Sequence, residues 1–252
     1  MPVHKPYPVS AESLLLQMDL AGVRRAYLIP PSWQGDSNAV ACDAAARFPD
    51  RFAVLGRIDI LDPESPGRMA GWKQQPGMIG VRCLGHRPEH LAALAGGRLD
   101  PLFAAAAAAD VRLTMMLPKA PDAADLIEQV AAAHPQLKIS VDHMNLFEPQ
   151  DVTDILPSLM RLAKFPNVAM KASCVPLVSR QRYPFRDTHD ALRMVFEHFG
   201  PQRMFWGSDL SRSVCSYSDN ITLFTEHLPW LRGGDLELVM GRAVLDWYGW
   251  PV

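Results

Sequence analysis

The sequence predicts an α/β fold built of repeated βα units, and three observations lead to this prediction. First, short apolar runs typical of buried strands alternate along all 252 residues with segments whose apolar residues recur at helical spacing. Second, several helical segments end in a His-Pro, Phe-Pro or Phe-Gly step directly before the next apolar run, and proline cannot continue a helix. Third, no linker, low-complexity run or block of charge divides the chain, so we expect one domain over residues 1–252.

Seven segments are expected to be strands: residues 26–30, 52–60, 78–83, 111–117, 138–142, 168–172 and 204–207. A first helix is expected directly after Ser10, whose side chain can cap it. Further helices are expected at residues 38–48, 99–108, 121–134, 151–164, 187–199, 218–228 and 235–248.

The number of strands sets the expected architecture. A closed (β/α) barrel needs eight strands, and this chain offers seven after an opening helix. We therefore expect a TIM-type (β/α)8 barrel that lacks its first strand. That strand is either truly lost or was left out by a start codon chosen too far downstream, and both explanations stay open. A doubly wound open sheet usually carries a glycine-rich loop after its first strand, and the sequence has none.

Composition excludes several classes of partner. The formal net charge is −2, with acidic and basic residues mixed along the chain, so nucleic acid is not an expected partner. No apolar stretch approaches the roughly 18 residues that a membrane span needs. The four cysteines form no CxxC pair, which favours neither a disulfide framework nor a structural zinc site. We expect a cytoplasmic protein that binds a small molecule, and self-association stays open.

Polar residues at the predicted strand ends are the candidates for chemistry, because a (β/α) barrel builds its active site there. A titratable residue that ends an apolar parallel strand is costly to bury without a partner or a role. Asp142-His143 and Gly207-Ser208-Asp209 stand out on this ground. Asp209 could take a proton from water, His143 could polarise a carbonyl, and Arg82 could hold a carboxylate through two hydrogen bonds. These residues favour hydrolysis or decarboxylation.

Other polar residues near strand ends have structural interpretations. Asp36 is expected to cap the helix that follows it. Asp59 and Asp62 lie in a proline-containing loop and are expected to form turns. His90 is expected to be a solvated helix residue.

Several motifs carry a resemblance over nearly the whole chain, among them LKISVDH, FPNVAMKAS and FGPQRMFWGSDLSR. With them the chain resembles the amidohydrolase-related (amidohydrolase 2) group of the amidohydrolase superfamily. It is similar to pyrone dicarboxylate lactonase, which needs no metal, and to aminocarboxymuconate semialdehyde decarboxylase, which does. The resemblance implies a distorted (β/α)8 barrel. It also matches Asp209 to the last-strand aspartate that activates water or ligates metal, His143 to the sixth-strand histidine and Arg82 to the arginine ending the fourth strand.

The chain departs from this family's pattern at its metal ligands. The family opens with a strand ending in His-x-His, and this sequence contains no His-x-His. The metal-binding members also carry a histidine at the end of the fifth strand, where this chain reads VRLTMMLPK. Because catalytic zinc normally needs three protein ligands, Asp209 and His143 alone predict no bound metal. Zinc at these two residues is kept as a minor alternative.

The leading hypothesis is a lactonase-like hydrolase acting on a small carboxylated substrate, a lactone or a ring-cleavage product. Asp209 and His143 are the predicted catalytic residues. The predicted substrate-binding residues are Arg82, Trp33, Lys171, Ser173, Tyr183, Arg186 and Arg212. Two alternatives remain: a metal-dependent hydrolase or decarboxylase with a truncated N-terminus, and a non-catalytic, degenerate barrel that binds a ligand or a partner subunit.

Overall fold

The computed structural model describes residues 9–85, 87–117, 122–149 and 151–250. Its strands form one sheet in the order β1-β2-β3-β4-β5-β6-β7, so each strand pairs with the next one along the chain. The pairs β1–β2, β2–β3, β3–β4, β4–β5 and β6–β7 are parallel. This sequential order is the topology of a (β/α) barrel. All seven predicted strands are present, with small shifts at their ends.

The chain divides into two compact units. Unit 1 comprises the residues up to Arg24 together with Asp142–Ala163 and Ala169–Trp247. Unit 2 comprises Arg25–Val141, Lys164–Val168 and the residues from Tyr248 onward.

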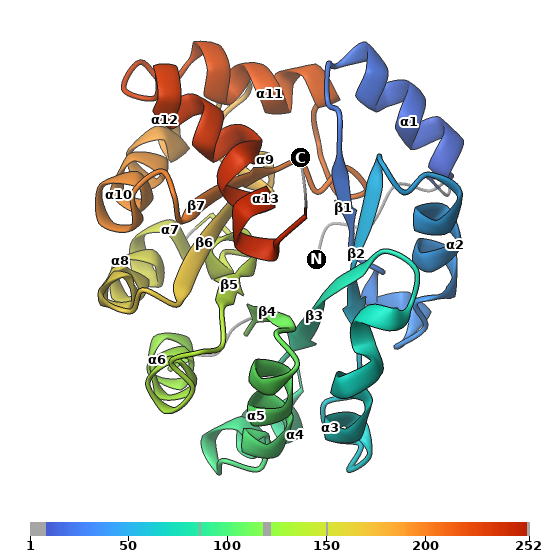
Figure 1. Cartoon of the computed structure of the whole chain (residues 1–252). Coiled ribbons are helices and arrows are strands. Elements are labelled where there is room, and N and C mark those ends of the chain that lie inside the picture. The colour runs from blue at the N-terminus through green and yellow to red at the C-terminus, as the bar shows by residue number, and fades with distance from the viewer. Residues whose placement is uncertain (1–8, 86, 118–121, 150, 251–252) are drawn as a thin grey trace. The chain divides into compact units, whose positions relative to one another are not determined.

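Unit 2 holds most of the sheet. Its strands are β1 (Ala26–Leu28), β2 (Phe52–Arg57), β3 (Met78–Leu84), β4 (Arg112–Met116) and β5 (Ile139–Val141). Its helices are η1 (Ser32–Gln34), α2 (Ala39–Arg47), α3 (Ser65–Arg68), η2 (Met69–Gln74), α4 (Pro88–Ala95), α5 (Asp100–Ala108) and α6 (Ala123–Ala133). Helices α2, α3, α5 and α6 lie outside the strands, and α3 and α5 lie side by side (Figure 1).

The core of unit 2 follows from its apolar strand sequences. Every residue of β2 is buried, and Phe52 and Leu55 are among the largest fully buried side chains, with Leu113 of β4 and Ile127 of α6. A buried polar cluster also lies in this unit. Tyr248 Oη is 2.6 Å from Thr114 Oγ1 and 2.7 Å from Ser140 Oγ, and the two smaller hydroxyls are 3.0 Å apart.

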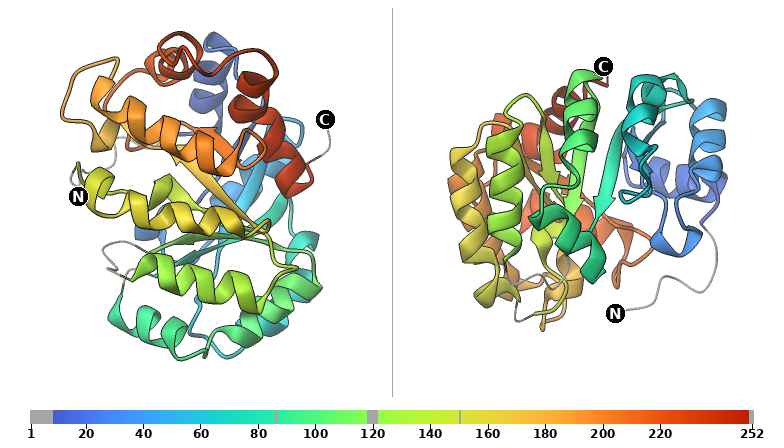
Figure 2. Two further views of the ribbon diagram at one scale, coloured as in Figure 1. Left: turned by 90° about the vertical axis from the view of Figure 1, so that its left-hand side faces the viewer. Right: turned by 90° about the horizontal axis from the view of Figure 1, so that it is seen from below.

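Unit 1 contains β7 (Met204–Gly207) and all but the first residue of β6 (Val168–Ser173). Its helices before β7 are α1 (Ala11–Leu20), η3 (Asp142–Asn145), α7 (Asp151–Asp154), α8 (Leu156–Leu159), η4 (Met160–Lys164), α9 (Val175–Val178), η5 (Arg186–Thr188) and α10 (His189–Phe199). After β7 come α11 (Tyr217–Glu226), α12 (Gly233–Glu237), η6 (Leu238–Arg242) and α13 (Ala243–Tyr248), whose last residue belongs to unit 2. Helix α10 packs against β7, as two views show (Figures 1 and 2).

Two predicted helices are broken in the structure. The helix predicted over residues 151–164 is three short pieces, because Pro157 begins a new turn at the start of α8 and has no N–H to continue the previous one. The helix predicted over 235–248 is interrupted by a π-helical turn, Leu238–Arg242, which contains Gly241. The predicted cap of α1 is confirmed, since Ser10 Oγ accepts a hydrogen bond from Ser13 N at 3.1 Å.

The structure also settles the roles of the minor polar residues. Asp59 and Asp62 form turns as predicted, since they accept hydrogen bonds from Leu61 N and Glu64 N, both at 2.9 Å. Asp36 does not cap a helix, because Asn38 holds the N-cap position of α2 and Asp36 pairs with an arginine. The prediction of a solvated His90 is wrong: its side chain is buried and accepts a hydrogen bond from Arg87.

Within the described residues, no single helix is long and apolar enough to cross a membrane. Only α4 and α5 taken together reach that length and composition, and they are bent by 74° relative to each other.

Candidate functional site

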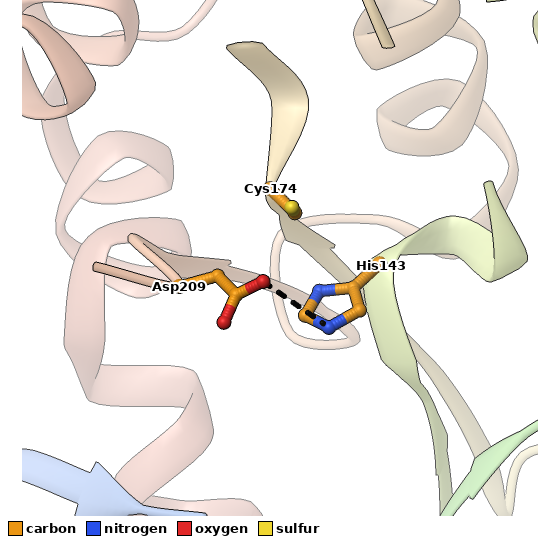
Figure 3. Close-up of side chains that lie close together, drawn as sticks. All are labelled: His143, Cys174 and Asp209. Atoms are coloured by element: carbon orange, nitrogen blue, oxygen red, sulfur yellow. Dashed lines mark ion pairs between the residues drawn. The ribbon is translucent and has the colours of Figure 1, made fainter. Parts of the chain in front are cut away.

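Three side chains of unit 1 converge at the ends of strands. Cys174 directly follows β6, Asp209 lies two residues after β7, and His143 lies in the turn after β5. Their side chains point toward one another (Figure 3), and one potential ligand atom from each lies within 4.8 Å of the others. His143 Nε2 and Asp209 Oδ2 are 3.7 Å apart. We call these three residues the His-Cys-Asp cluster.

All three residues have left-handed backbone conformations. The φ angles are 52° at His143, 62° at Cys174 and 47° at Asp209. For residues other than glycine this region costs on the order of 1–3 kcal/mol each and persists only where the surrounding structure enforces it. Such positions gather at active sites. Here they turn each side chain away from its strand toward the other two.

Ser173 orients the imidazole of His143. The His143 side chain is buried, and its Nδ1 lies 2.8 Å from Ser173 Oγ. This hydrogen bond leaves Nε2 facing Asp209. Because 3.7 Å exceeds the length of a direct hydrogen bond, an atom of a bound water or substrate could contact both groups.

Gly207 lets β6 and β7 approach closely at this point. A Cβ placed on Gly207 would lie 3.1 Å from the Cβ of Ser173, closer than side chains normally pack. The Gly207-Ser208-Asp209 motif therefore has two parts. Its glycine accommodates Ser173, and its aspartate completes the cluster.

The surroundings of Cys174 keep its thiol protonated. Burial raises the pKa of Cys174 well above its usual value, and the negative charge of Asp209 and a hydrogen bond to that carboxylate raise it further. The positive charge of Arg212 opposes these effects. Arg212 Nη1 lies 3.9 Å from Asp209 Oδ2, so this predicted substrate-binding residue lies beside the cluster.

A second ion pair lies next to the cluster in the sequence. Asp142 is fully buried, and Lys171 Nζ donates a hydrogen bond to its Oδ1 at 2.5 Å. Buried charges are retained where they are paired in this way. The ammonium group of Lys171 is thus bonded to protein, and its predicted contact with substrate stays a prediction.

The remaining predicted residues lie elsewhere. Tyr183 and Arg186 are exposed residues of unit 1, and the hydroxyl of Tyr183 lies 2.7 Å from Thr222 Oγ1. Arg82 on β3 and Trp33 in η1 belong to unit 2. Arg82 Nη2 lies 2.6 Å from Met116 Sδ. The structure therefore groups His143, Ser173, Asp209 and Arg212, and the catalytic and substrate-binding roles of all the predicted residues stay predictions.

The sequence analysis missed Cys174 as a candidate. A cysteine continues the apolar pattern of a buried strand, so only its place directly after Ser173 could have drawn attention to it. With Cys174 the cluster offers a nitrogen, a sulfur and an oxygen donor. Three such ligands with one open position are the pattern of catalytic zinc sites. The prediction of no metal was based on two donors, and the structure supplies a third.

A family model described as "Amidohydrolase" matches residues 3–252. The chain belongs to the amidohydrolase family. No curated protein matches it. The family membership confirms the resemblance drawn from the sequence motifs.

Solved structures of other proteins share the amidohydrolase fold of this chain. One is described as a probable 2-pyrone-4,6-dicarboxylic acid hydrolase from Acinetobacter baumannii with citric acid bound. It is 18% identical, with a TM-score of 0.81 over 97% of this chain and 90% of the other. An amidohydrolase from Burkholderia multivorans with bound zinc is 19% identical, with a TM-score of 0.82 over 96% of this chain and 89% of the other.

The 5-carboxyvanillate decarboxylase from Sphingomonas paucimobilis is 19% identical and has a TM-score of 0.64, over 93% of this chain and 82% of the other. The family and its fold are therefore shown. A probable hydrolase and a decarboxylase are both among these similar structures, and the choice between the two reactions stays open for this amidohydrolase.

Proposed function

We propose that this amidohydrolase hydrolyses a small carboxylated substrate, a lactone or a ring-cleavage product, at the His-Cys-Asp cluster. The observation that carries the proposal is the convergence of His143, Cys174 and Asp209 from three strand ends, each held in a left-handed backbone conformation. A strained and converging arrangement of this kind is expected where chemistry takes place.

Asp209 is the proposed general base. Its carboxylate would take a proton from a water molecule as the oxygen of that water attacks the substrate carbonyl. His143 would bind the oxygen of that carbonyl through Nε2, because Nδ1 is already bonded to Ser173. The ester or lactone bond then breaks, and the leaving oxygen takes up the proton. Arg212, which lies beside Asp209, is the proposed partner of a substrate carboxylate in this unit.

A metal-dependent hydrolase or decarboxylase is the second candidate, because the donor atoms of His143, Cys174 and Asp209 suit zinc. A bound zinc ion would supply Lewis-acid activation of a carbonyl or of water. In that case the three side chains would hold the ion, and Ser173 would orient the imidazole as it does in the structure. The thiol of Cys174 would have to lose its proton, so binding of zinc would release a proton to the solvent.

Elemental analysis of the purified protein separates the two candidates. The variants are Asp209→Asn, His143→Ala and Cys174→Ala, with Asp43→Asn and His198→Ala as controls. Asp43 and His198 are exposed and lie on helices away from the cluster residues in sequence. Stoichiometric zinc or manganese that is lost in the cluster variants alone would establish the second candidate. Absence of metal, with activity lost in Asp209→Asn and His143→Ala only, would support the first.

The substrate panel should contain carboxylated lactones, beginning with 2-pyrone-4,6-dicarboxylate, and carboxylated phenols such as 5-carboxyvanillate. These compounds are chosen from the descriptions of the similar structures. Release of carbon dioxide from a phenol would identify a decarboxylase. The non-catalytic barrel would be favoured by two results together: the protein turns over none of these compounds, and the variants bind them as the wild type does.

A further inference from the structure

Two side chains of β6 hold the two residues that follow β5. Lys171 and Ser173 are two positions apart on β6, so their side chains leave the same face of the strand. Ser173 Oγ lies 2.8 Å from His143 Nδ1. Lys171 Nζ donates a hydrogen bond to Asp142 Oδ1 at 2.5 Å. Successive residues of the turn are therefore fixed by alternate residues of one strand, and the proposed function uses only the contact of Ser173.

The turn that begins at Asp142 has a backbone that needs support from outside. The φ angles of His143–Asn145 are 52°, 53° and 53°, a region that residues other than glycine occupy only where the surrounding structure enforces it. These residues are all buried. At the far end of the turn the Asp151 carboxylate accepts hydrogen bonds from two backbone N–H groups, at 2.7 and 2.9 Å. The bond between Lys171 and Asp142 is the corresponding attachment at the near end.

Stability alone does not account for the pair of Lys171 and Asp142. The side chain of Asp142 is 0% exposed and that of Lys171 is 11% exposed. The attraction between two such charges returns little more free energy than their removal from water costs, so apolar residues of similar size would stabilise the fold as well. Apolar residues would not supply a directed bond between β6 and the turn. The pair therefore points to a requirement for a defined geometry.

His143 is the residue whose position depends on this bond. Its Nε2 lies 3.7 Å from Asp209 Oδ2, a separation that one bridging atom can span. Asp142 precedes His143 directly, so a shift of Asp142 displaces the whole imidazole, whatever Ser173 bonds at Nδ1. A displacement of about 1 Å between reacting groups can lower a rate about a hundredfold. Ser173 orients the ring, and the remaining need is a fixed backbone.

We propose that Lys171 is a positioning residue, which places the backbone of His143 at the His-Cys-Asp cluster through its bond to Asp142. The proposal deepens the proposed function and rests on it for the role of His143. It gives Lys171 a role different from the substrate contact that the sequence predicts.

Lys171→Met tests the proposal, because methionine is similar in shape and lacks the ammonium group. We expect the ring signals of His143 to shift in the NMR spectrum. The amide of Leu146, which donates to His143 O at 2.9 Å, should exchange with solvent about tenfold faster. Neither measurement needs turnover. With the substrate that the panel identifies, kcat should fall about tenfold or more while KM stays within about twofold.

Lys164→Met is the matched control. Lys164 also loses an ion pair in this variant, since its Nζ donates to Glu128 Oε1 at 2.7 Å, but its side chain is 58% exposed. The His143 ring signals, the exchange of Leu146 and kcat should all stay as in the wild type.

Asp142→Asn combined with Lys171→Met guards against misfolding, because Lys171→Met alone leaves a buried charge without its partner. The double variant has no charge at either position, and the same changes are expected in it. Unchanged His143 ring signals and Leu146 exchange in either folded variant would overturn the proposal. A rise in KM with an unchanged kcat would also overturn it, because Lys171 would then be a substrate contact. Absence of turnover with every compound would count against the proposed function, and the ring signals would still decide this proposal.

Discussion

Ser173 holds the imidazole of His143 in one orientation. The hydrogen bond between Ser173 Oγ and His143 Nδ1 determines which ring nitrogen is presented to Asp209. The side chain contacts no reacting atom in the proposed mechanism, so Ser173 is a positioning residue.

Replacing Ser173 with alanine should release the imidazole. We expect His143 to lose its single tautomer, and kcat/KM to fall on the order of tenfold with the substrate that the panel identifies. The nitrogen chemical shifts of the ring, measured by NMR, report the tautomer without any need for turnover. The free energy of unfolding should fall by only about 1 kcal/mol.

Ser65→Ala is the matched control for this variant. Ser65 is also fully buried, and it donates a hydrogen bond to Asp59 O at 2.6 Å in the other unit. It should lose similar stability while the His143 ring signals stay unchanged. Identical ring signals in Ser173→Ala and the wild type would show that Ser173 does not position the imidazole.

The candidate residues were predictable from sequence to different degrees. His143 and Asp209 stood out because a polar group directly follows an apolar run. Cys174 also lies past the predicted strand, but it was not chosen, because a buried cysteine behaves as a small apolar side chain. The position of Arg57 at a strand end was not predicted. The strand was expected to reach residue 60, whereas β2 ends at Arg57.

At the scale of elements, hydrophobic periodicity predicted the strands and the longer helices, because burial of one face determines both. The helices outside the predicted ranges are η1, α3, η2, α4, η3 and α9. Five of them are too short to show a helical period, and α4, in which His90 was expected as a helix residue, has only 8 residues. Pro157 and the π-helical turn at Leu238–Arg242 broke helices whose apolar spacing continued through them.

Tyr248 connects the end of the chain to two strands of unit 2. Its hydroxyl completes a buried triangle with Thr114 of β4 and Ser140 of β5. Tyr248→Phe should lower the free energy of unfolding by about 1–2 kcal/mol, because two buried hydroxyls each lose one of their partners while keeping each other. Urea unfolding measures this loss.

Tyr183→Phe provides the comparison. Its hydroxyl bonds Thr222 at the surface, where water can replace the lost partner, so the change in stability should be a few tenths of a kcal/mol. An equal loss in both variants would mean that the buried triangle adds nothing beyond an ordinary surface hydrogen bond.

At the scale of the whole molecule, stability should depend on alkaline pH through buried thiols. Burial raises the pKa of Cys83 to about 12, and that of Cys174 is also raised well above its usual value. In the unfolded chain both thiols ionise near pH 9. Above that pH the unfolded state gives up protons that the folded state retains, so unfolding becomes more favourable as pH rises.

The expected slope is a loss of about 1.4 kcal/mol per pH unit for each thiol. Urea unfolding between about pH 8 and pH 11 should show this slope, and it should be shallower in Cys83→Ala. Val81→Ala on the same strand is the control, since a packing loss lowers stability equally at every pH. A slope unaffected by Cys83→Ala would mean that the thiol of Cys83 ionises alike in the folded and unfolded chain.

The turn after β5 carries a consequence for laboratory evolution. His143, Met144 and Asn145 are three successive residues with φ angles of 52°, 53° and 53°, and none is glycine. Random mutagenesis under selection for heat resistance alone is therefore expected to find glycine substitutions here, because glycine adopts a positive φ angle without strain. Each such substitution lets the imidazole drift from its neighbours. Mutant libraries intended to raise the thermal stability of this amidohydrolase should therefore keep these three codons unchanged and vary exposed helix positions instead.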